Sequence, residues 1–385
     1  PSPAARSPAG RRAVGALAAM NGGRVPLVLD VDTGTDDALA LLLALRCPAV
    51  EVLAVTCVHG NVDVGMVLQN TLKVLDAAEA PPDLPVACGL EQPLVEPVTH
   101  CPEIHGYDGL GDLQPPLPES RRQPRAEHAV ELLNATLRAA PGPVTIVALA
   151  PLTNIAVALR LAPSLWRSKV ARIVWMGGAV AAGGNATPWA EANARYDPEA
   201  AHIVFSSGLP LLIYPWDVFL KVGYGKEELC ALGVPDVDAA SGGAQEVATR
   251  PAWSRLAGRI LWRELRQFGS QEAKIGDAGA LVALLQASAV KTRKLAVAVE
   301  LHGGHTRGMT AFDLRGRVHP PDEMQKPPNA EVVVDLDASA VKAFFTEHVF
   351  ASQQKEPAAL PAGAEPAPCA APALQPLRAG GAAAL

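Results

Sequence analysis

An apolar run passes directly into a cluster of acids in the stretch 25–37, which reads VPLVLDVDTGTDD. Its first seven residues have the valine and leucine content of a buried strand, and an Ala/Leu-rich helical pattern follows the last acid. The acids therefore fall in a strand-to-helix turn, at the carboxyl end of the first strand, where open α/β sheets bind their ligands. They are Asp30, Asp32, Asp36 and Asp37.

The same alternation of β-rich and helical segments continues along the chain. It is typical of a parallel sheet that is covered by helices on both faces. The sequence therefore predicts an α/β fold with a mostly parallel central sheet and an active site at the carboxyl ends of its strands. The predicted strands include 25–31, 50–58, 144–149, 173–176 and 211–214, and the predicted helices include 38–45, 66–77 and 154–161.

Composition divides the chain into a leader (1–23), a long body (24–353) and a tail (354–385). The tail is rich in Ala and Pro, a composition that favours disorder. Residues 1–19 carry arginines and serines but no acid, which fits either an unstructured leader or a mitochondrial transit peptide. We expect a cytoplasmic protein, with mitochondrial targeting left open.

The overall composition narrows the possible partners. The 385 residues are 49% hydrophobic and 19% charged, with a net charge of -6. No basic stripe is present, so we expect no nucleic-acid partner, and no apolar stretch has membrane-spanning character. The six cysteines form no CxxC pair, which fits a reducing compartment better than a disulfide framework or a zinc ribbon.

Four acids in one turn indicate a hard divalent cation, because so many carboxylates repel one another without one. The simplest alternative is that Asp36 and Asp37 only cap the following helix, but this leaves the other two acids unexplained. A second alternative is a haloacid-dehalogenase-type phosphatase with a nucleophile at Asp30 and an acid at Asp32. Gly34 departs from that motif, which has Thr or Val there.

The acids also resemble the DxDxGxDD signature of the inosine-uridine-preferring nucleoside hydrolases, and further motifs follow in the same order over roughly 25–345. The resemblance implies the nucleoside hydrolase version of a Rossmann-like fold, and Ca²⁺-dependent hydrolysis of ribonucleosides to free base and ribose. The family also implies a homodimer or homotetramer. The further motifs are His59-Gly60-Asn61, the segments 104–111 and 151–156, Met176-Gly177-Gly178, Gly184-Asn185-Ala186, Glu191, Asn193 and the segment 196–201.

The resemblance implies a role for each acid. Asp32 and Asp37 would bind Ca²⁺, together with Asp277 and the main-chain carbonyl of Thr153, and Ca²⁺ accepts such a mixture of oxygen ligands. Asp36 would be the general base that takes a proton from a calcium-bound water. Asp30 would support the loop without touching the ion.

The resemblance also implies a set of substrate contacts. Amide and carboxylate side chains can pair with ribose hydroxyl groups as donors or acceptors, although an isolated Asn more often forms a turn. His105 lies in a glycine-rich loop and is the candidate catalytic histidine beside the departing base. The expected substrate-binding residues are Asn61, Met176, Asn185, Glu191, Asn193 and Asp277.

One position departs from the family pattern. A histidine that protonates the leaving base commonly precedes the last calcium aspartate, whereas Gly276 precedes Asp277 here. Three outcomes remain open at this level. His105, Lys274 or another acid replaces the histidine; stacking alone activates the base; or the protein is a catalytically weak or inactive homologue that binds nucleoside or ribose.

Overall fold

The computed structural model describes residues 23–236, 250–315 and 326–351. These residues belong to one compact unit, Pro1–Ala351. The predicted leader, apart from Gly23, and the predicted tail lie outside the described residues.

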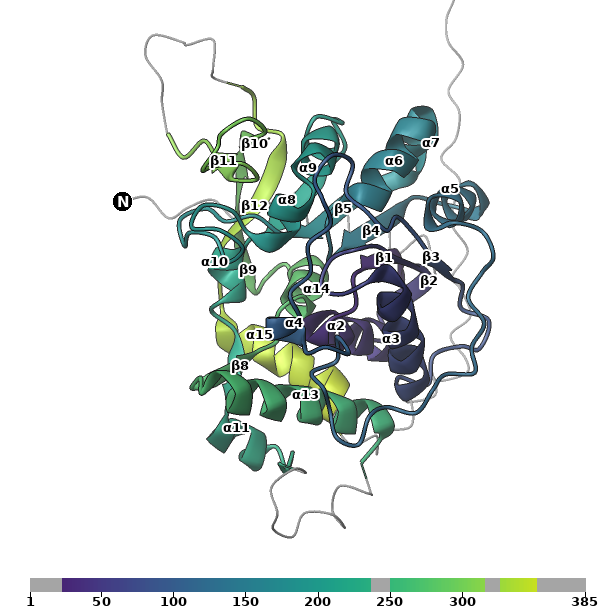
Figure 1. Cartoon of the computed structure of the whole chain (residues 1–385), viewed down its shortest axis with the longest axis vertical. Coiled ribbons are helices and arrows are strands. Elements are labelled where there is room, and N and C mark those ends of the chain that lie inside the picture. The colour runs from purple at the N-terminus through teal and green to yellow at the C-terminus, as the bar shows by residue number, and fades with distance from the viewer. Residues whose placement is uncertain (1–22, 237–249, 316–325, 352–385) are drawn as a thin grey trace, which may run out of the picture. The chain divides into compact units, whose positions relative to one another are not determined.

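An eight-stranded sheet forms the centre of the fold, in the order β3-β2-β1-β4-β5-β6-β12-β9 (Figure 1). Neighbouring strands are parallel except for β12 and β9, which pair antiparallel. The fold class predicted from the sequence is therefore confirmed. The strands of this sheet are β1 (Val25–Val31), β2 (Val50–Cys57), β3 (Val86–Cys88), β4 (Val144–Ala148), β5 (Val170–Met176), β6 (Leu211–Tyr214), β9 (Val290–Leu295) and β12 (Ala330–Leu336).

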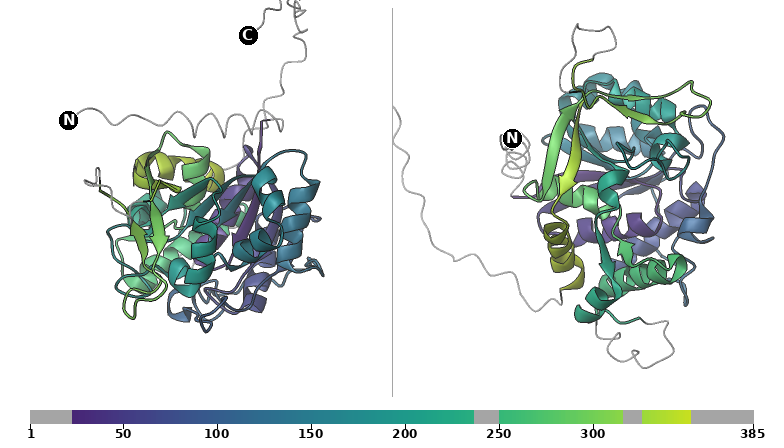
Figure 2. Two further views of the ribbon diagram at one scale, coloured as in Figure 1. Left: turned by 90° about the horizontal axis from the view of Figure 1, so that it is seen from above. Right: turned by 90° about the vertical axis from the view of Figure 1, so that its left-hand side faces the viewer.

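Helices cover both faces of this sheet, and Figures 1 and 2 show them as a layer on either side. The first layer contributes to one apolar core and the second to another. The first layer comprises α2 (Thr35–Arg46), α3 (Val64–Ala77), α13 (Ala252–Phe268), α14 (Ala278–Leu285) and α15 (Ala338–Phe345), which continues as a π-helical turn, Thr346–Phe350. The second layer comprises α5 (Ala129–Ala139), α6 (Thr153–Leu161), α7 (Pro163–Lys169) and α9 (Pro198–Phe205).

Strand β1 illustrates why the sheet is buried on both faces. All seven of its residues are buried, as expected of a central parallel strand. Successive side chains alternate between the faces, so Leu27 and Leu29 join the core under α2 while Val28 joins the core under α6. The strand ends at Val31, and the chain there turns into α2 with the acids at the carboxyl edge of the sheet.

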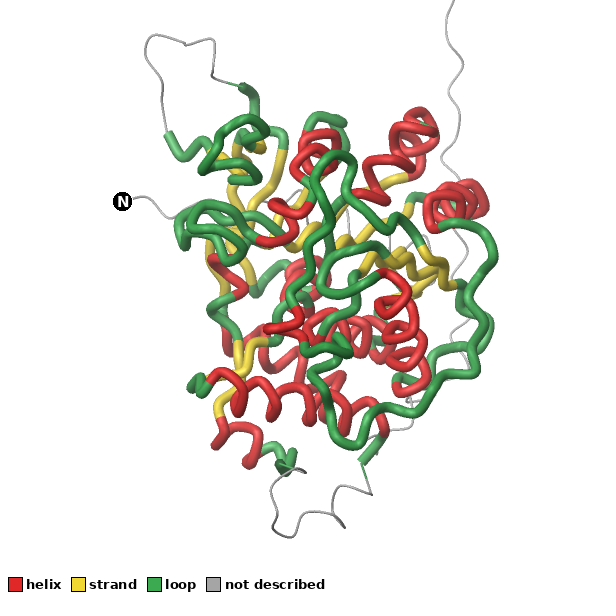
Figure 3. Tube along the Cα trace, viewed as in Figure 1, coloured by secondary structure: helices red, strands yellow, loops and turns green. Residues whose placement is uncertain are grey.

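Short helices and two small sheets complete the described fold. The long loop between α4 and α5 is drawn green in Figure 3 and passes beside α3. Among the described residues, no helix has both the length and the apolar character needed to cross a membrane. The remaining elements are α4 (Pro102–His105), α8 (Ala192–Tyr196), α10 (Trp216–Phe219), α11 (Lys226–Ala231), the antiparallel pair β7 (Gly223–Gly225) and β8 (Glu272–Lys274), and the antiparallel pair β10 (Val297–Val299) and β11 (Thr310–Phe312).

Candidate active site

Three carboxylates meet at the carboxyl edge of the sheet. Asp36, Asp37 and Asp277 each offer one oxygen, and these oxygens lie within 4.8 Å of one another. The first two lie in the first turn of α2, and Asp277 directly precedes α14. Because α2 and α14 both pack into the same core, acids that are distant in the sequence come together, and the cluster could hold a metal ion.

Asp32 lies beside this cluster but is not one of its three members. Its Oδ2 accepts a hydrogen bond from the backbone N–H of Asn61 at 2.9 Å. A Cβ on Gly60 would lie 1.9 Å from the same Oδ2, so only glycine allows this close approach of the two loops. Asp37 accepts from the N–H groups of Gly34 at 2.9 Å and Asp32 at 3.3 Å, and thus holds the turn that presents the acids.

Burial and mutual repulsion favour the protonated forms of these acids. Burial, reinforced by Asp36, raises the pKa of Asp37 to about 8. The pKa values of Asp32 and Asp277 are raised well above their ordinary range, first by burial and then by neighbouring carboxylates. Asp32 Oδ1 and Asp277 Oδ1 are also buried without a hydrogen-bond partner among the described residues. A divalent cation fits this donor set, because it would offset the repulsion and satisfy both oxygens.

Asp30 links strand β1 to strand β2 and to helix α6. Its Oδ1 accepts hydrogen bonds from Thr56 Oγ1 at 2.6 Å and Asn154 Nδ2 at 2.8 Å. Burial raises the pKa of Asp30 to about 7, although both hydrogen bonds oppose the shift. The side chain is fully buried and is not among the pocket-lining residues, which fits a supporting role better than that of a phosphatase nucleophile.

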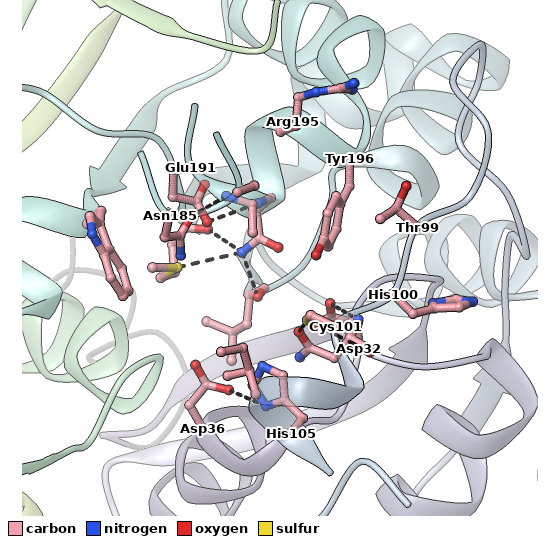
Figure 4. Close-up of a pocket in the computed structure, with 18 of the residues that line it drawn as sticks. Asp32, Asp36, Thr99, His100, Cys101, His105, Asn185, Glu191, Arg195 and Tyr196 are labelled. Carbon is pink, nitrogen blue, oxygen red and sulfur yellow. Dashed lines mark hydrogen bonds and ion pairs between the residues drawn. The ribbon is translucent and has the colours of Figure 1, made fainter. Parts of the chain in front are cut away.

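The acids line a pocket of about 530 Å³, a volume within the usual range for small-molecule sites. Figure 4 shows Asp36 and His105 on one side of the cavity, with Asn185 and Glu191 across from them. Asp37 and Thr153 are the two predicted site residues that do not line it. The predicted residues that do are Asp32, Asp36, Asn61, His105, Met176, Asn185, Glu191, Asn193 and Asp277.

The amide side chains on the far wall are held in defined orientations. Asn193 Nδ2 donates to the carbonyl oxygens of Leu149 and Met176, each at 3.1 Å, which leaves its Oδ1 as an acceptor. Asn185 Oδ1 accepts from the N–H of Ala192 at 2.8 Å, which leaves its Nδ2 as a donor. The two residues thus present complementary groups for sugar hydroxyls.

Glu191 anchors this wall. It is the N-cap of α8, and its carboxylate accepts from the N–H groups of Asn193, Ala194 and Gly178. Burial raises the pKa of Glu191 to about 7 against these hydrogen bonds.

Asn61 is also largely engaged within the protein. Its Nδ2 donates to Asp37 Oδ2 at 3.1 Å, and its Oδ1 accepts from the thiol of Cys101 at 3.5 Å. The sugar contact expected from the sequence stays a prediction, whereas the geometry shows that Asn61 orients an acid of the cluster.

His105 ends the short helix α4 and is buried beside Asp36, with His105 Nδ1 lying 3.8 Å from Asp36 Oδ1. The backbone N–H of Thr35 donates to the same Nδ1 at 3.2 Å, so Nδ1 is an acceptor and the ring proton lies on Nε2. Burial lowers the pKa of His105, although Asp36 opposes the shift. The ring is thereby kept neutral near pH 7, with one N–H to donate.

Thr153 and His59 lie behind the pocket. Thr153 is buried at the start of α6, and its hydroxyl donates to Asp197 Oδ2 at 2.7 Å. His59 Nε2 lies 2.9 Å from that hydroxyl oxygen and, because the hydroxyl proton is already used, donates to it. Burial lowers the pKa of His59 to about 4, so the residue is a neutral support of the loop.

Several pocket residues were not found by sequence reasoning. His100 and Cys101 reach the cavity on the loop between β3 and α4, for which the sequence carried no pattern. Tyr196 ends α8 and belongs to the motif segment 196–201, but no site role was predicted for it. Trp216 and Phe219 follow β6 directly and could have been found from the rule that ligands sit beyond strand ends. The missed residues are Pro97, Thr99, His100, Cys101, Glu103, Ile104, Leu149, Ala186, Thr187, Ala192, Arg195, Tyr196, Trp216 and Phe219.

Gly276 lies directly against Asp36. A Cβ at this position would be 2.5 Å from Asp36 Cβ and 3.0 Å from Phe219 Cε2. Its φ of +51° is in the left-handed region, which glycine adopts without steric cost. Lys274, one candidate to replace the missing acid, bonds through Nζ to Glu272 at 2.7 Å and is not among the lining residues.

A mostly parallel sheet with a carboxylate-rich pocket at its carboxyl edge defines an α/β enzyme with a candidate divalent-metal site. The model of the family "Inosine-uridine preferring nucleoside hydrolase" matches residues 27–343. The chain belongs to this family.

Individual relatives agree with the family match. The chain is 36% identical over 328 residues to a pyrimidine-specific ribonucleoside hydrolase, RihA, of Salmonella gallinarum, covering 84% of this chain and 98% of the relative. Among solved structures, an inosine-guanosine nucleoside hydrolase has a TM-score of 0.75 at 30% identity and covers 86% of this chain and 100% of its own. The structure of a plant nucleoside hydrolase has a TM-score of 0.74 at 30% identity. The match covers 85% of this chain and 99% of the plant enzyme.

The comparisons confirm the resemblance and the enzyme class that were inferred from the sequence. The chain is a nucleoside hydrolase, and hence an N-glycosidase. The names of these relatives indicate different base preferences, pyrimidine-specific for one and inosine-guanosine for another.

Proposed function

We propose that the chain hydrolyses ribonucleosides to free base and ribose with Ca²⁺ at the carboxylate cluster and Asp36 as general base. The observation that carries this proposal is the meeting of Asp36, Asp37 and Asp277 within 4.8 Å in a pocket whose opposite wall presents oriented amides. The ion would be held by Asp32, Asp37, Asp277 and the main-chain carbonyl of Thr153. Bound Ca²⁺ supplies Lewis-acid activation of the attacking water.

Asp36 suits the role of base because it reaches the cavity. Its side chain is 22% exposed, whereas Asp32 and Asp37 are almost fully buried. The N–H of Asp37 donates to Asp36 Oδ1 at 3.2 Å, which fixes one carboxylate oxygen and leaves Oδ2 to accept the proton of the attacking water.

Asn185 and Asn193 would hold the ribose, one as donor and the other as acceptor. Because cleavage builds positive charge on the ribose ring, the carboxylates beside it also favour the transition state. His105, neutral with its proton on Nε2, would donate a hydrogen bond or a proton to the leaving base. We expect His105 to be the main donor to the leaving base, because Gly276 has no side chain that could donate a hydrogen bond or a proton.

Incubation with inosine, uridine and adenosine, with Ca²⁺ or with EDTA, tests the activity and the ion. We expect ribose release in Ca²⁺, loss of release in EDTA, and recovery when Ca²⁺ is restored in preference to Mg²⁺. Absence of ribose release from every nucleoside in Ca²⁺ would contradict the proposal.

Substitution of the base tests the mechanism. Asp36→Ala should lower kcat by roughly 10²–10⁴-fold, the usual contribution of a positioned general base. Asp63→Ala is the matched control, because Asp63 caps α3 through a hydrogen bond to the N–H of Gly65 and lies outside the pocket. A cap costs ~1 kcal/mol of stability and should leave kcat unchanged. Equal effects of the two substitutions would show that Asp36 is only a cap.

Gly276 favours a second candidate, a homologue that binds nucleoside or ribose with little or no turnover. It predicts a rise of Tm with ribose or nucleoside in Ca²⁺ and no product after long incubation. Any sustained release of ribose that depends on Asp36 rejects this candidate.

A further inference from the structure

The loop between β5 and α8 forms part of the pocket wall. Its residues Asn185, Ala186 and Thr187 line the cavity. Gly178 and Gly183 have positive φ values of +73° and +77°, so the loop reverses direction at positions that favour glycine.

Asp217 contacts this loop. Its Oδ2 accepts a hydrogen bond from the N–H of Val180 at 2.7 Å, and its Oδ1 accepts from those of Ala181 at 2.7 Å and Ala182 at 2.9 Å. Three consecutive backbone donors thus converge on one carboxylate. Such charge-assisted hydrogen bonds are roughly twice as strong as neutral ones, and three of them fix both the position and the direction of the segment.

The helix that carries Asp217 is itself part of the site. Trp216 and Phe219, on either side of Asp217 in α10, line the pocket, and their rings are 4.5 Å apart. The N–H of Trp216 donates to the carbonyl oxygen of Gly178 at 2.8 Å. One short helix therefore provides an aromatic wall and also fastens the neighbouring loop to it.

We propose that Asp217 is a positioning residue for substrate binding, which holds the segment 180–182 against α10 so that Asn185 and Thr187 face the ligand. Asp217 is not among the pocket-lining residues and acts only through the loop. The identity of the ligand as the ribose of a nucleoside rests on the proposed function, whereas the anchoring of the loop does not.

Kinetics and binding test the effect on the site. In Asp217→Ala we expect KM for the nucleoside and Kd for ribose to rise about tenfold, with kcat changed less than about threefold, because the loop contacts the sugar and not the water. Asp217→Asn keeps one acceptor oxygen and should fall between the wild type and Asp217→Ala. Unchanged KM and Kd in both variants would overturn the proposal.

Asp76→Asn is the matched control. Asp76 in α3 fastens the loop between α4 and α5, because it accepts hydrogen bonds from Ser120 Oγ and Arg122 Nε, each at 2.6 Å. No residue of that loop is among the pocket-lining residues. We expect Asp76→Asn to lower Tm without changing KM or Kd. A rise of KM equal to that of Asp217→Asn would show that any loosened loop has this effect, and would also overturn the proposal.

Limited proteolysis tests the anchoring without turnover. Thermolysin cuts before apolar residues, and the anchored segment Val180-Ala181-Ala182 offers such sites. We expect Asp217→Ala to be cut there at least tenfold faster than the wild type, and ribose to slow the cut. If the wild type neither releases nor binds ribose, the proposed function fails while this comparison still decides the role of Asp217. Equal rates of cutting in the wild type and in Asp217→Ala would reject the anchoring role of Asp217.

Discussion

At the scale of single residues, the contact between Gly276 and Asp36 is the most restrictive feature of the site. The backbone at 276 occupies the space beside the candidate base, and Phe219 closes the same space from the other side. A glycine here is therefore more than the loss of a proton donor. It is the residue that lets Asp36 lie where it does.

Restoring the histidine should consequently fail. In Gly276→His and Gly276→Ala, the new Cβ would meet Asp36 Cβ at 2.5 Å, and a left-handed conformation costs about 1–2 kcal/mol outside glycine. Displacing the base by such a distance should lower kcat on the order of 10²-fold in both variants. Steady-state kinetics with the best nucleoside measures this.

Gly142→Ala provides the control, since a Cβ at Gly142 meets nothing within 4 Å and its φ is not in the positive range. If Gly276→His raised kcat above that of the wild type, position 276 would have to tolerate a proton donor, and the steric argument would be wrong.

The sequence allowed prediction of those pocket residues whose chemical type and spacing are themselves unusual. Four acids at a strand end could be recognised because their repulsion requires an explanation. Cys101 could not, because a cysteine in a loop is common and only the folded path brings it to the cavity. Tyr196 ends the short helix α8, and its motif alone does not show that its side chain faces the cavity. The engagement of Asn61 with Asp37 was also hidden, since it depends on side-chain orientation.

At the scale of elements, helix α13 holds the short helix α4 that carries His105. Arg263 Nη1 donates to the carbonyl oxygen of Ile104 at 2.7 Å, and Gln267 Nε2 donates to that of Glu103 at 2.8 Å. The two donors lie one helical turn apart. A long amphipathic helix thus fixes four residues that would be marginal alone.

Removing this contact should weaken catalysis without removing any pocket residue. We expect the double variant Arg263→Ala, Gln267→Ala to lose about tenfold in kcat/KM, because His105 is no longer held, and each lost hydrogen bond contributes about 1 kcal/mol. Hydrogen exchange at the amides of α4 should accelerate in parallel.

The control on the same helix is Arg255→Ala, because Arg255 Nη1 donates to the carbonyl oxygen of Arg250 and, among the described residues, forms no hydrogen bond with α4. If amide hydrogen exchange in α4 stayed slow and kcat/KM stayed at the wild-type value in the double variant, α4 would be stable without its contacts to α13.

Where the hydrophobic pattern of a strand or helix is long and regular, its predicted bounds agree closely with the structure. The first strand has the predicted bounds, 25–31, and the predicted helix 154–161 begins only one residue late. The small antiparallel pair β10 and β11 was not predicted as such, because three-residue strands have too few residues to establish a period of two. The antiparallel position of β9 depends on pairing with β12, which no local pattern encodes.

At the scale of the whole molecule, the buried carboxyl groups link stability to pH and to the cation. Burial raises the pKa of Asp30 and of Glu191 to about 7, above the values of about 4 expected in the unfolded chain. The folded state therefore holds these protons more tightly, so that without a cation their contribution to stability is full below about pH 4 and is lost as pH rises from about 4 to about 7.

We expect Tm in EDTA to fall between pH 5 and pH 8, and the gain in Tm from Ca²⁺ to increase over the same range, because a cation binds deprotonated carboxylates. Differential scanning calorimetry at four pH values measures both curves. Asp30→Asn should flatten the EDTA curve and keep the Ca²⁺ gain. A Tm in EDTA that rises from pH 5 to pH 8 would contradict the assignment.

The distribution of the acids along the chain has a consequence for synthesis. Asp32 and Asp37 leave the ribosome early, with the first strand and helix, whereas Asp277 follows only after six strands of the central sheet have been made. Until then the growing chain carries a repelling set of carboxylates that lacks its last member. A complete cation site therefore requires that nearly the whole domain has been synthesised and assembled, and a chain that stops before α14 lacks Asp277 or its supporting helix.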